Sequence, residues 1–264
     1  MCFSRGNLQF QASTNTWRFA ENQWDYVGNG NLGNVSEKGV YSNNNKISAF
    51  YDGWIDLFCW GTSGWNSGAY SYQPYSHGGY TDDYYPGGNW NNSLIGTFAN
   101  ADWGMYNAIS NGGNFAGIWR TLTKSEWTYL FFDRVNAEKL YSQATIQSVR
   151  GIVILPDTWR TPIQCKFTPC TEDWTTNNYS ATEWEVMQLN GAVFLPAAGY
   201  SYTDPVIDGT VSTEDLDSGY YWSSSSGDSM TACCLHFYTR KIVIGFGGGY
   251  RCYGYSVRLV QDVK

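Results

Sequence analysis

The residues that could perform chemistry are few, and several of them lie near the C-terminal end of the chain. Four consecutive serines at positions 223–226 precede His236, one of only two histidines. A serine nucleophile with a histidine base would suit a hydrolase, but the G-x-S-x-G turn is missing and no orienting Asp can be identified. The serines and His236 therefore do not predict a hydrolytic site.

Cysteines are the next candidates, and the chain has seven: Cys2, Cys59, Cys165, Cys170, Cys233, Cys234 and Cys252. The count is odd, two of them are adjacent, and no CxxC pair occurs, which is a poor pattern for a disulfide framework or a zinc site. Cys165 and Cys170 could bridge a loop, but reduced thiols are the default expectation. We expect neither a cofactor nor a bound metal ion.

Two other segments have partial ligand-binding patterns. An acidic loop contains Asp204, Asp208, Glu214, Asp215 and Asp217. These carboxylates could bind calcium, but EF-hand spacing is absent and a solvated loop is the favoured interpretation. The glycines at 247–249 resemble a phosphate-binding loop only weakly, because no Walker-type lysine accompanies them.

Charge and composition exclude some classes of function. The net charge is −7 and Lys and Arg form no run, which argues against a nucleic-acid partner. No apolar stretch approaches the roughly 20 residues of a membrane-spanning helix, and no signal-peptide pattern follows Met1. The chain begins almost inside a predicted strand, as a fragment of a longer protein would.

The aromatic content is high, at 18%, whereas charged residues make up 15% of the chain against a typical value of about 25%. This composition predicts a loop-rich protein held together by buried rings. Most Tyr and Trp side chains should be core, although these residue types also suit a binding surface because they give a large contact area at low entropic cost.

Strands, loops and helices can be placed from local patterns. Residues 3–10 and 16–19 predict a hairpin, residues 26–45 a loop, and residues 55–60 a short apolar segment. Residues 61–118 are too long for a plain loop in a compact domain, so we expect ordered irregular structure fixed by aromatic side chains. These are Trp65, Tyr70, Trp90, Trp103 and Tyr106.

Two capping boxes predict helix starts. Thr123 with Glu126, and Ser180 with Glu183, have the spacing in which each side chain caps the other residue's amide. Apolar residues then recur at helical spacing, namely Trp127, Leu130, Phe131 and Val135 in the first helix and Trp184, Met187 and Leu189 in the second. Apolar strands follow at 151–156 and 191–200. This order predicts one α+β domain over residues 1–264 with an antiparallel sheet.

The last part of the chain has two regular ends and a mixed middle. Tyr220, Tyr221 and Trp222 predict one strand, and alternation through residues 255–260 predicts another. Between them, residues 227–252 follow no single chemistry. Leu235 and Phe237 should point inward, and His236 and Tyr238 outward. Arg258 lies among apolar neighbours and needs a buried partner, and residues 119–121 are interpreted as structural.

Five fragments together resemble a known family: SRGNLQF at 4–10, WRTLTKSEW at 119–127, FLPAAGY at 194–200, YWSSS at 221–225 and GYSVRLV at 254–260. They resemble C-type-lectin-fold domains of gut Bacteroidetes surface proteins and phages, related to the Bacteroidetes major paralogous domain. The resemblance spans nearly the whole chain. It implies a C-type lectin fold with two helices, an antiparallel sheet and long ordered loops.

The same fold occurs in the variable proteins of diversity-generating retroelements, whose C-terminal residues are diversified by adenine-directed mutagenesis, typically from Asn-rich template codons. The last asparagine here is Asn190, and residues 223–260 contain no Glu, Gln or Trp, which Asn codons cannot reach by changes at adenines. Met230 and Lys241 are also unreachable and need another explanation. The pattern supports a variable region over residues 219–260.

Other members of this fold fit less well. Formylglycine-generating enzymes use a closely spaced C-terminal cysteine pair, whereas Cys252 has no second cysteine at suitable spacing. The EPN, QPD and WND sugar motifs of animal lectins are absent too. An oxidoreductase-like relative of the formylglycine enzyme remains a third alternative, which a Cys252→Ser variant would test.

The resemblance therefore implies a non-enzymatic binding protein with a diversified C-terminal face. Tyr238 and Phe246 would be anchors, and Asp228, His236 and Arg240 polar selectors. The ligand would be a surface protein or glycan of a bacterial or host cell, with protein favoured. The chain would act on a phage tail tip or a bacterial cell surface, with a homo-oligomer left open. The alternative is a fixed-specificity bacterial adhesin or glycan-binding module. The full set of candidate contacts is Asp228, Met230, Thr231, Cys234, His236, Tyr238, Arg240, Lys241, Val243, Phe246 and Cys252.

Overall fold

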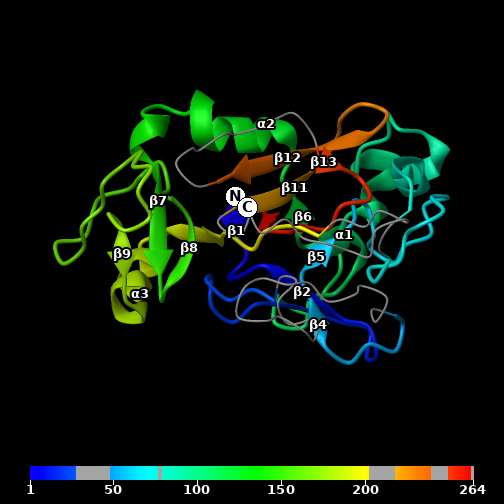
Figure 1. Cartoon of the computed structure of the whole chain (residues 1–264), viewed down its shortest axis with the longest axis horizontal. Coiled ribbons are helices and arrows are strands. Elements are labelled where there is room, and N and C mark those ends of the chain that lie inside the picture. The colour runs from blue at the N-terminus through cyan, green and yellow to red at the C-terminus, as the bar shows by residue number, and fades with distance from the viewer. Residues whose placement is uncertain (28–47, 77–78, 202–217, 239–248, 263–264) are drawn as a thin grey trace.

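The computed structural model describes residues 1–27, 48–76, 79–201, 218–238 and 249–262. Within these residues the chain is α+β, with short helices and four small β-sheets that are mostly antiparallel (Figure 1). None of the helices in the described ranges is long and apolar enough to cross a membrane. The predicted acidic loop at 204–217 and most of the predicted loop at 26–45 lie outside the described residues.

The predicted N-terminal hairpin is confirmed in part. Strands β2 (Leu8–Gln11) and β3 (Thr16–Phe19) pair antiparallel, and β4 (Trp54–Ile55) joins the other edge of β2. The first residues do not continue this hairpin. They form a separate strand, β1 (Cys2–Phe3), because the chain bends where the buried amide of Asn7 bonds to other segments.

Strand β1 brings the two ends of the chain together. It pairs antiparallel with β15 (Leu259–Gln261), which in turn pairs with β6 (Arg120–Thr121) in a three-stranded sheet. The two termini consequently lie next to each other in Figure 1.

A five-stranded sheet forms the centre of the molecule, in the order β13-β12-β11-β14-β5. Strands β11 and β12 form a long antiparallel hairpin, whereas β14 pairs parallel to β11. One antiparallel sheet was expected from the sequence, so this parallel pair is a correction. The bounds of these strands are β5 (Leu57–Phe58), β11 (Gly219–Ser226), β12 (Thr231–Phe237), β13 (Gly249–Tyr250) and β14 (Tyr255–Ser256).

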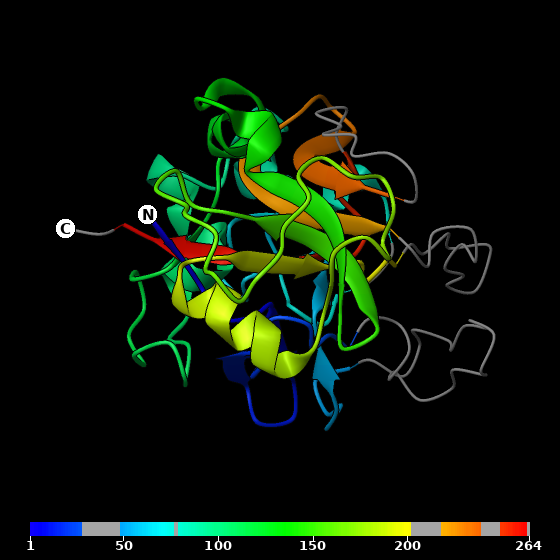
Figure 2. The same ribbon diagram turned by 90° about the vertical axis from the view of Figure 1, so that its left-hand side faces the viewer.

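The fourth sheet has the order β10-β8-β7-β9 and carries the longest helix. Strands β7 and β9 are a second parallel pair. Trp184 and Met187 of α3 pack into the same apolar cluster as strand residues of this sheet, and α3 lies along its side (Figure 2). The bounds are β7 (Tyr141–Ile146), β8 (Val149–Ile154), β9 (Asn178–Tyr179), β10 (Val193–Pro196) and α3 (Ala181–Leu189).

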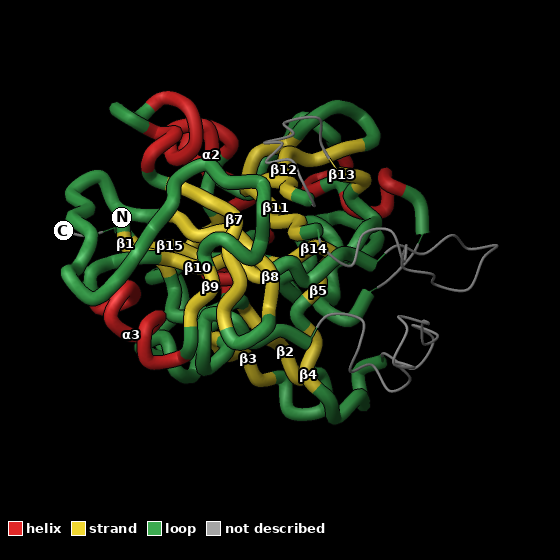
Figure 3. Tube along the Cα trace, turned by 60° about the vertical axis from the view of Figure 1, so that its left-hand side comes forward, coloured by secondary structure: helices red, strands yellow, loops and turns green. Residues whose placement is uncertain are grey.

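Both predicted capping boxes are confirmed, but the first helix is shorter than predicted. Thr123 and Glu126 cap α2 (Lys124–Thr128), and Ser180 and Glu183 cap α3. After α2 the chain widens into a π-helix, η5 (Tyr129–Asp133). The predicted core position Val135 is 85% exposed, because the helical periodicity ends before it. Helix α2 packs over β11 and β12, and the strands lie between α2 and α3 in Figure 3.

Residues 61–76 and 79–118 form turns and short helices rather than strands. Of the five aromatic residues predicted to fix this segment, Trp103 is fully buried and Trp65 packs against the core, whereas Tyr70 is 85% exposed. Tyr70 therefore does not fix this segment, whereas Trp90 and Tyr106 are partly covered, with 38% and 41% of their surface exposed. The helices of the described chain not yet placed are α1 (Trp103–Tyr106), η2 (Thr81–Tyr84), η3 (Pro86–Gly88), η4 (Gly96–Ala101) and η6 (Ala137–Lys139).

The β11–β12 hairpin packs against apolar clusters on both faces. On one face Tyr221, Leu235 and Phe237 pack with the helix residue Trp127. On the other face Trp222 and its neighbours join a second cluster that draws on residues from Leu8 to Leu259. This hairpin is therefore the rigid element from which the outward side chains of β12 project.

Candidate ligand-binding face

The predicted contact residues that the structure describes lie in three places: at the tip of the β11–β12 hairpin, at the end of β12, and, for two cysteines, in the interior. Seven of the eleven predicted residues are described. The other four, Arg240, Lys241, Val243 and Phe246, lie outside the described residues.

The hairpin tip is organised by the carboxylate of Asp228. Its Oδ1 accepts hydrogen bonds from the amide of Met230 at 2.8 Å, the amide of Thr231 at 2.9 Å and the Thr231 hydroxyl at 2.8 Å. These bonds, led by the one from Met230, lower the pKa of Asp228. Asp228 and Thr231 are thus engaged in holding the turn, and Met230 projects beside them with 49% of its surface exposed.

The tip is also attached to residues 85–93, which the sequence did not assign to the site. Tyr85 donates its hydroxyl hydrogen to the carbonyl oxygen of Ser229. The buried guanidinium of Arg251 donates from Nη2 to the carbonyl oxygens of Trp90 at 2.8 Å and Asp228 at 3.1 Å. It also lies over the ring of Trp60, 4.4 Å from the centroid, and burial lowers its pKa to about 10.

The alternation predicted for β12 is confirmed. Leu235 and Phe237 are fully buried, whereas His236 and Tyr238 are half-buried on the opposite face. In the register of the hairpin, His236 lies across from Tyr220. The two rings stack with centroids 4.0 Å apart and an interplanar angle of 13°.

This stack is part of a larger group, here called the tyrosine cluster. The Tyr220 ring stacks on Tyr255 at 4.8 Å, and His236 contacts Tyr238 at 5.0 Å. Near-parallel rings therefore follow one another from the core residue Tyr255 to the outer end of β12. The cluster consists of Tyr200, Tyr220, His236, Tyr238, Tyr250, Tyr253 and Tyr255.

The sequence predicted only two of these seven rings as contacts. Tyr250 is 40% exposed at the edge strand β13, and Tyr200, Tyr220 and Tyr253 are half-buried. Tyr255 is 4% exposed, and burial raises its pKa well above the usual value. Tyrosines at positions 250, 253 and 255 are closely spaced, and this pattern could have indicated from the sequence that they belong to the site. The strand register that places Tyr220 beside His236 could not be predicted from the sequence, because it depends on how β11 pairs with β12.

Cys234 and Cys252 do not lie on the exposed surface. Cys234 shares the face of His236 but is 5% exposed in the core cluster with Trp222, and burial raises its pKa to about 12. Cys252 is 8% exposed and packs in a small cluster with Cys59 and Tyr84. Their predicted contact role is therefore corrected to a buried one, because β12 directs Cys234 into the core and the turn after β13 packs Cys252 against Cys59 and Tyr84.

The serine run is structural. Ser223 and Ser224 are buried, and the main chain of Ser224 bonds to Leu122 and Leu94 at 2.8 Å each. Ser225 Oγ accepts the amide of Lys124 at 3.0 Å. These bonds attach β11 to its neighbouring loops. Within the described ranges, no three His, Cys, Asp or Glu side chains are grouped to hold a metal ion.

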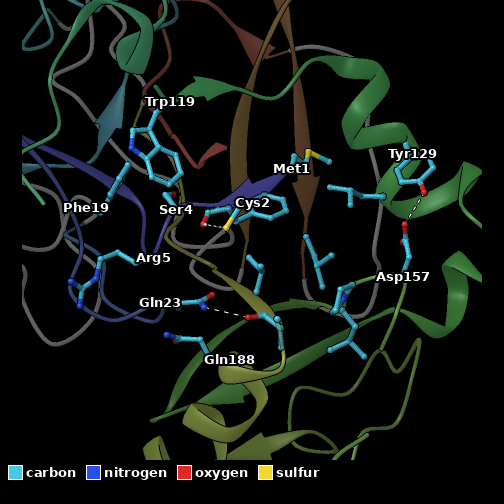
Figure 4. Close-up of a pocket in the computed structure, with 18 of the residues that line it drawn as sticks. Met1, Cys2, Ser4, Arg5, Phe19, Gln23, Trp119, Tyr129, Asp157 and Gln188 are labelled. Atoms are coloured by element: carbon cyan, nitrogen blue, oxygen red, sulfur yellow. Dashed lines mark hydrogen bonds between the residues drawn. The ribbon is translucent and has the colours of Figure 1, made fainter. Parts of the chain in front are cut away.

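A separate cleft of about 750 Å³ lies beside β1. In Figure 4, Phe19 and Trp119 mark one end and Tyr129 and Asp157 the other, with β1 between them. Several of its polar side chains bond within the protein; Asn111, for example, bonds both to the amide and to the carbonyl of Phe19. None of the seven described contact residues lines this cleft.

Among the described residues, the tyrosine cluster thus combines two predicted contact residues, His236 and Tyr238, with five further tyrosine rings. It presents ring faces and hydroxyl groups on a rigid sheet, which suits recognition by stacking and hydrogen bonding. Comparison of the chain with protein-family models, with curated proteins and with solved structures found no match.

Proposed function

We propose that this chain is a non-enzymatic ligand-binding protein with a C-type lectin fold, whose C-terminal face is diversified by a retroelement. Its ligand is a surface protein, or else a glycan, of a bacterial or host cell. The protein acts in adhesion or receptor binding on a phage tail tip or a bacterial cell surface. The α+β arrangement and the two capped helices at the predicted positions support the fold assignment.

The observation that carries the binding role is the tyrosine cluster. Ring contacts link side chains on β11 and β12 with Tyr255 and with the turn after β13, while the opposite face of the hairpin is packed under α2. Rigid aromatic rings are effective anchors because they bury a large area and lose little rotamer freedom. Tyr238 ends this face, and the predicted contacts Arg240 to Phe246 follow it directly in the sequence.

The retroelement is tested by sequencing the DNA around the gene. The proposal expects a reverse transcriptase and a near-repeat of codons 218–260 that differs only at adenines. It further expects the variable codons to include His236 and Tyr238 and to spare Leu235 and Phe237, whose side chains are fully buried.

Closely related copies of the chain separate this proposal from the alternative of a fixed-specificity adhesin. Differences confined to outward positions between residues 227 and 252 support diversification. Differences spread evenly over the surface, with no near-repeat, would favour the adhesin and remove the argument for the variable region.

A further inference from the structure

Cys59 follows β5, and Cys252 lies in the turn between β13 and β14. Strands β5 and β14 pair with Phe58 opposite Tyr255. Beyond this pair the register shifts, because residues 250–253 form a turn, and the amide of Trp60 donates to the carbonyl oxygen of Arg251 at 2.9 Å. These contacts hold the turn that contains Cys252 against the residues that follow β5.

The side chains confirm that the two residues are neighbours. Cys59 Sγ lies 3.1 Å from the carbonyl oxygen of Cys252 and is fully buried. Both side chains pack against Tyr84 in one small apolar cluster.

We propose that Cys59 and Cys252 form a disulfide bond when the chain meets a disulfide oxidant. One cysteine thiolate attacks a sulfur of oxidised glutathione and releases one glutathione. The second thiolate then attacks the protein sulfur of this mixed disulfide and releases the second glutathione. Two thiol protons leave the protein and end on the two glutathione thiols, so the protein is oxidised and glutathione reduced.

The bond would fasten the turn at residues 250–253 to the segment after β5. In this turn the amide of Tyr253 donates to the carbonyl oxygen of Tyr250 at 2.9 Å, and both rings belong to the tyrosine cluster. The disulfide therefore gives Cys252 a role that is independent of ligand contact. It would hold in a fixed-specificity adhesin as well as in a diversified protein.

The other cysteines lack such a partner arrangement. Cys233 Sγ lies 3.3 Å from the carbonyl oxygen of Ser226, and Cys170 Sγ lies 3.9 Å from the hydroxyl of Tyr141. Cys165 belongs to a cluster around α3. Oxidation should therefore be selective for one pair.

Burial raises the pKa of Cys252 to about 11, so its thiolate is scarce in the folded protein. The test therefore includes refolding, during which both thiols are accessible. The full chain is unfolded, refolded in a mixture of reduced and oxidised glutathione, blocked with an alkylating reagent and digested with trypsin without reduction. A sample of folded protein is treated in parallel.

Trypsin releases Cys59 within residues 47–120 and Cys252 within residues 252–258, and each peptide contains a single cysteine. We expect these two peptides to be joined by a disulfide and the number of free thiols to fall by two. We also expect the melting temperature to rise by several degrees, because the closed loop is long. Absence of the joined peptide after refolding, a stable glutathione adduct on either cysteine, or a different joined pair would each overturn the proposal.

A matched control variant separates the loss of the disulfide from the loss of a buried thiol as such. Cys252→Ser should abolish the oxidation-dependent rise in melting temperature. Cys165→Ser, with the same 8% exposure, should retain it. If Cys252→Ser does not fold, the peptide map of the unaltered chain alone decides the proposal.

Discussion

At the scale of single residues, the polar side chains of the C-terminal segment mainly hold the backbone that displays the rings. Asp228 is exposed, but its carboxylate is committed to its own turn. Arg251 is fully buried and joins that turn to residue 90 through one guanidinium nitrogen. Ligand recognition therefore depends on the shape of this surface as well as on the residue types at the tip.

Replacing Asp228 by Asn should loosen the hairpin tip. The carboxylate pKa is lowered in the folded state, so its stabilising effect is present above the unfolded pKa of about 3.9 and is lost as the pH falls through the folded value. The difference in unfolding free energy between the two proteins should therefore shrink from pH 7 to pH 3 in urea titrations. A difference that stays constant over this range would show that the charge of Asp228 is irrelevant to the turn.

Removing the central ring of the tyrosine cluster should destabilise the fold itself. Tyr220 contacts the rings of Tyr200, His236 and Tyr255, so Tyr220→Ala loses three ring contacts and should cost about 2–3 kcal/mol, whereas Tyr220→Phe keeps all three. Tyr70→Ala is the control, because that ring is 85% exposed. Equal unfolding free energies for the Tyr220→Ala and Tyr70→Ala variants would contradict the packing described for the cluster.

At the scale of elements, local sequence patterns predicted where the helices start, whereas the strand partners depend on pairing between distant segments. A capping box is complete within four residues, so Thr123 and Ser180 were sufficient to place α2 and α3. The switch to a π-helix at Tyr129 has no comparable local signal. Strands β1 and β15 pair although they lie at opposite ends of the sequence, and no local pattern indicates this. Trp103 is buried and Tyr70 is exposed because burial depends on the packing of segments that are distant in the sequence.

The two capping boxes differ in one respect, from which we expect them to contribute unequally to the stability of the fold. Glu126 also receives two hydrogen bonds from Arg120, at 2.8 and 2.7 Å, and Arg120 bonds to Asp262 at 2.8 Å. Burial alone would raise the pKa of Glu126, but the bonds from Arg120 and Thr123 outweigh it and lower the pKa. The first capping box therefore joins α2 to β6 and to the C-terminal residues.

Glu126→Gln should cost about 1–2 kcal/mol at pH 7, as the sum of a weakened cap and a lost, partly exposed ion pair. Glu183→Gln in α3 removes only the cap charge and should cost less. The excess for Glu126 should shrink as the pH falls below the unfolded pKa and through the lowered folded value, because stability from a lowered pKa is lost on acidification. Matching losses for the two variants at pH 7 would mean that Arg120 contributes nothing measurable.

At the scale of the whole molecule, a buried polar network connects the N-terminal residues, β10, β11 and the last segment. Arg258 is fully buried and donates to Gln23 Oε1 at 3.0 Å and to Asn7 Oδ1 at 3.4 Å. The Asn7 amide donates to the Tyr221 hydroxyl at 3.2 Å, which donates to the carbonyl oxygen of Pro196 at 2.8 Å. The sequence indicated that Arg258 needs a partner, but two neutral amides more than 230 positions away could not be identified from it.

Gln23 is the residue on which this network depends most. Its Oε1 accepts from Arg258 and from the amide of Phe194 at 2.5 Å, and its Nε2 donates to the carbonyl oxygen of Ala192 at 3.3 Å. Gln23→Leu would keep the volume but remove the nearest acceptor of a buried cation, whose pKa burial already lowers to about 10. Leaving a buried charge uncompensated costs about 3–5 kcal/mol.

We therefore expect Gln23→Leu to be among the most damaging single substitutions in the chain, with a loss of about 3 kcal/mol in urea-induced unfolding. Gln188→Leu is the matched control, because Gln188 is exposed at the cleft beside β1. The loss should be smaller in the double variant Gln23→Leu/Arg258→Met than in Gln23→Leu alone, since the second change removes the orphaned charge. A double variant that loses the sum of both single effects would show that Gln23 acts through packing rather than through Arg258.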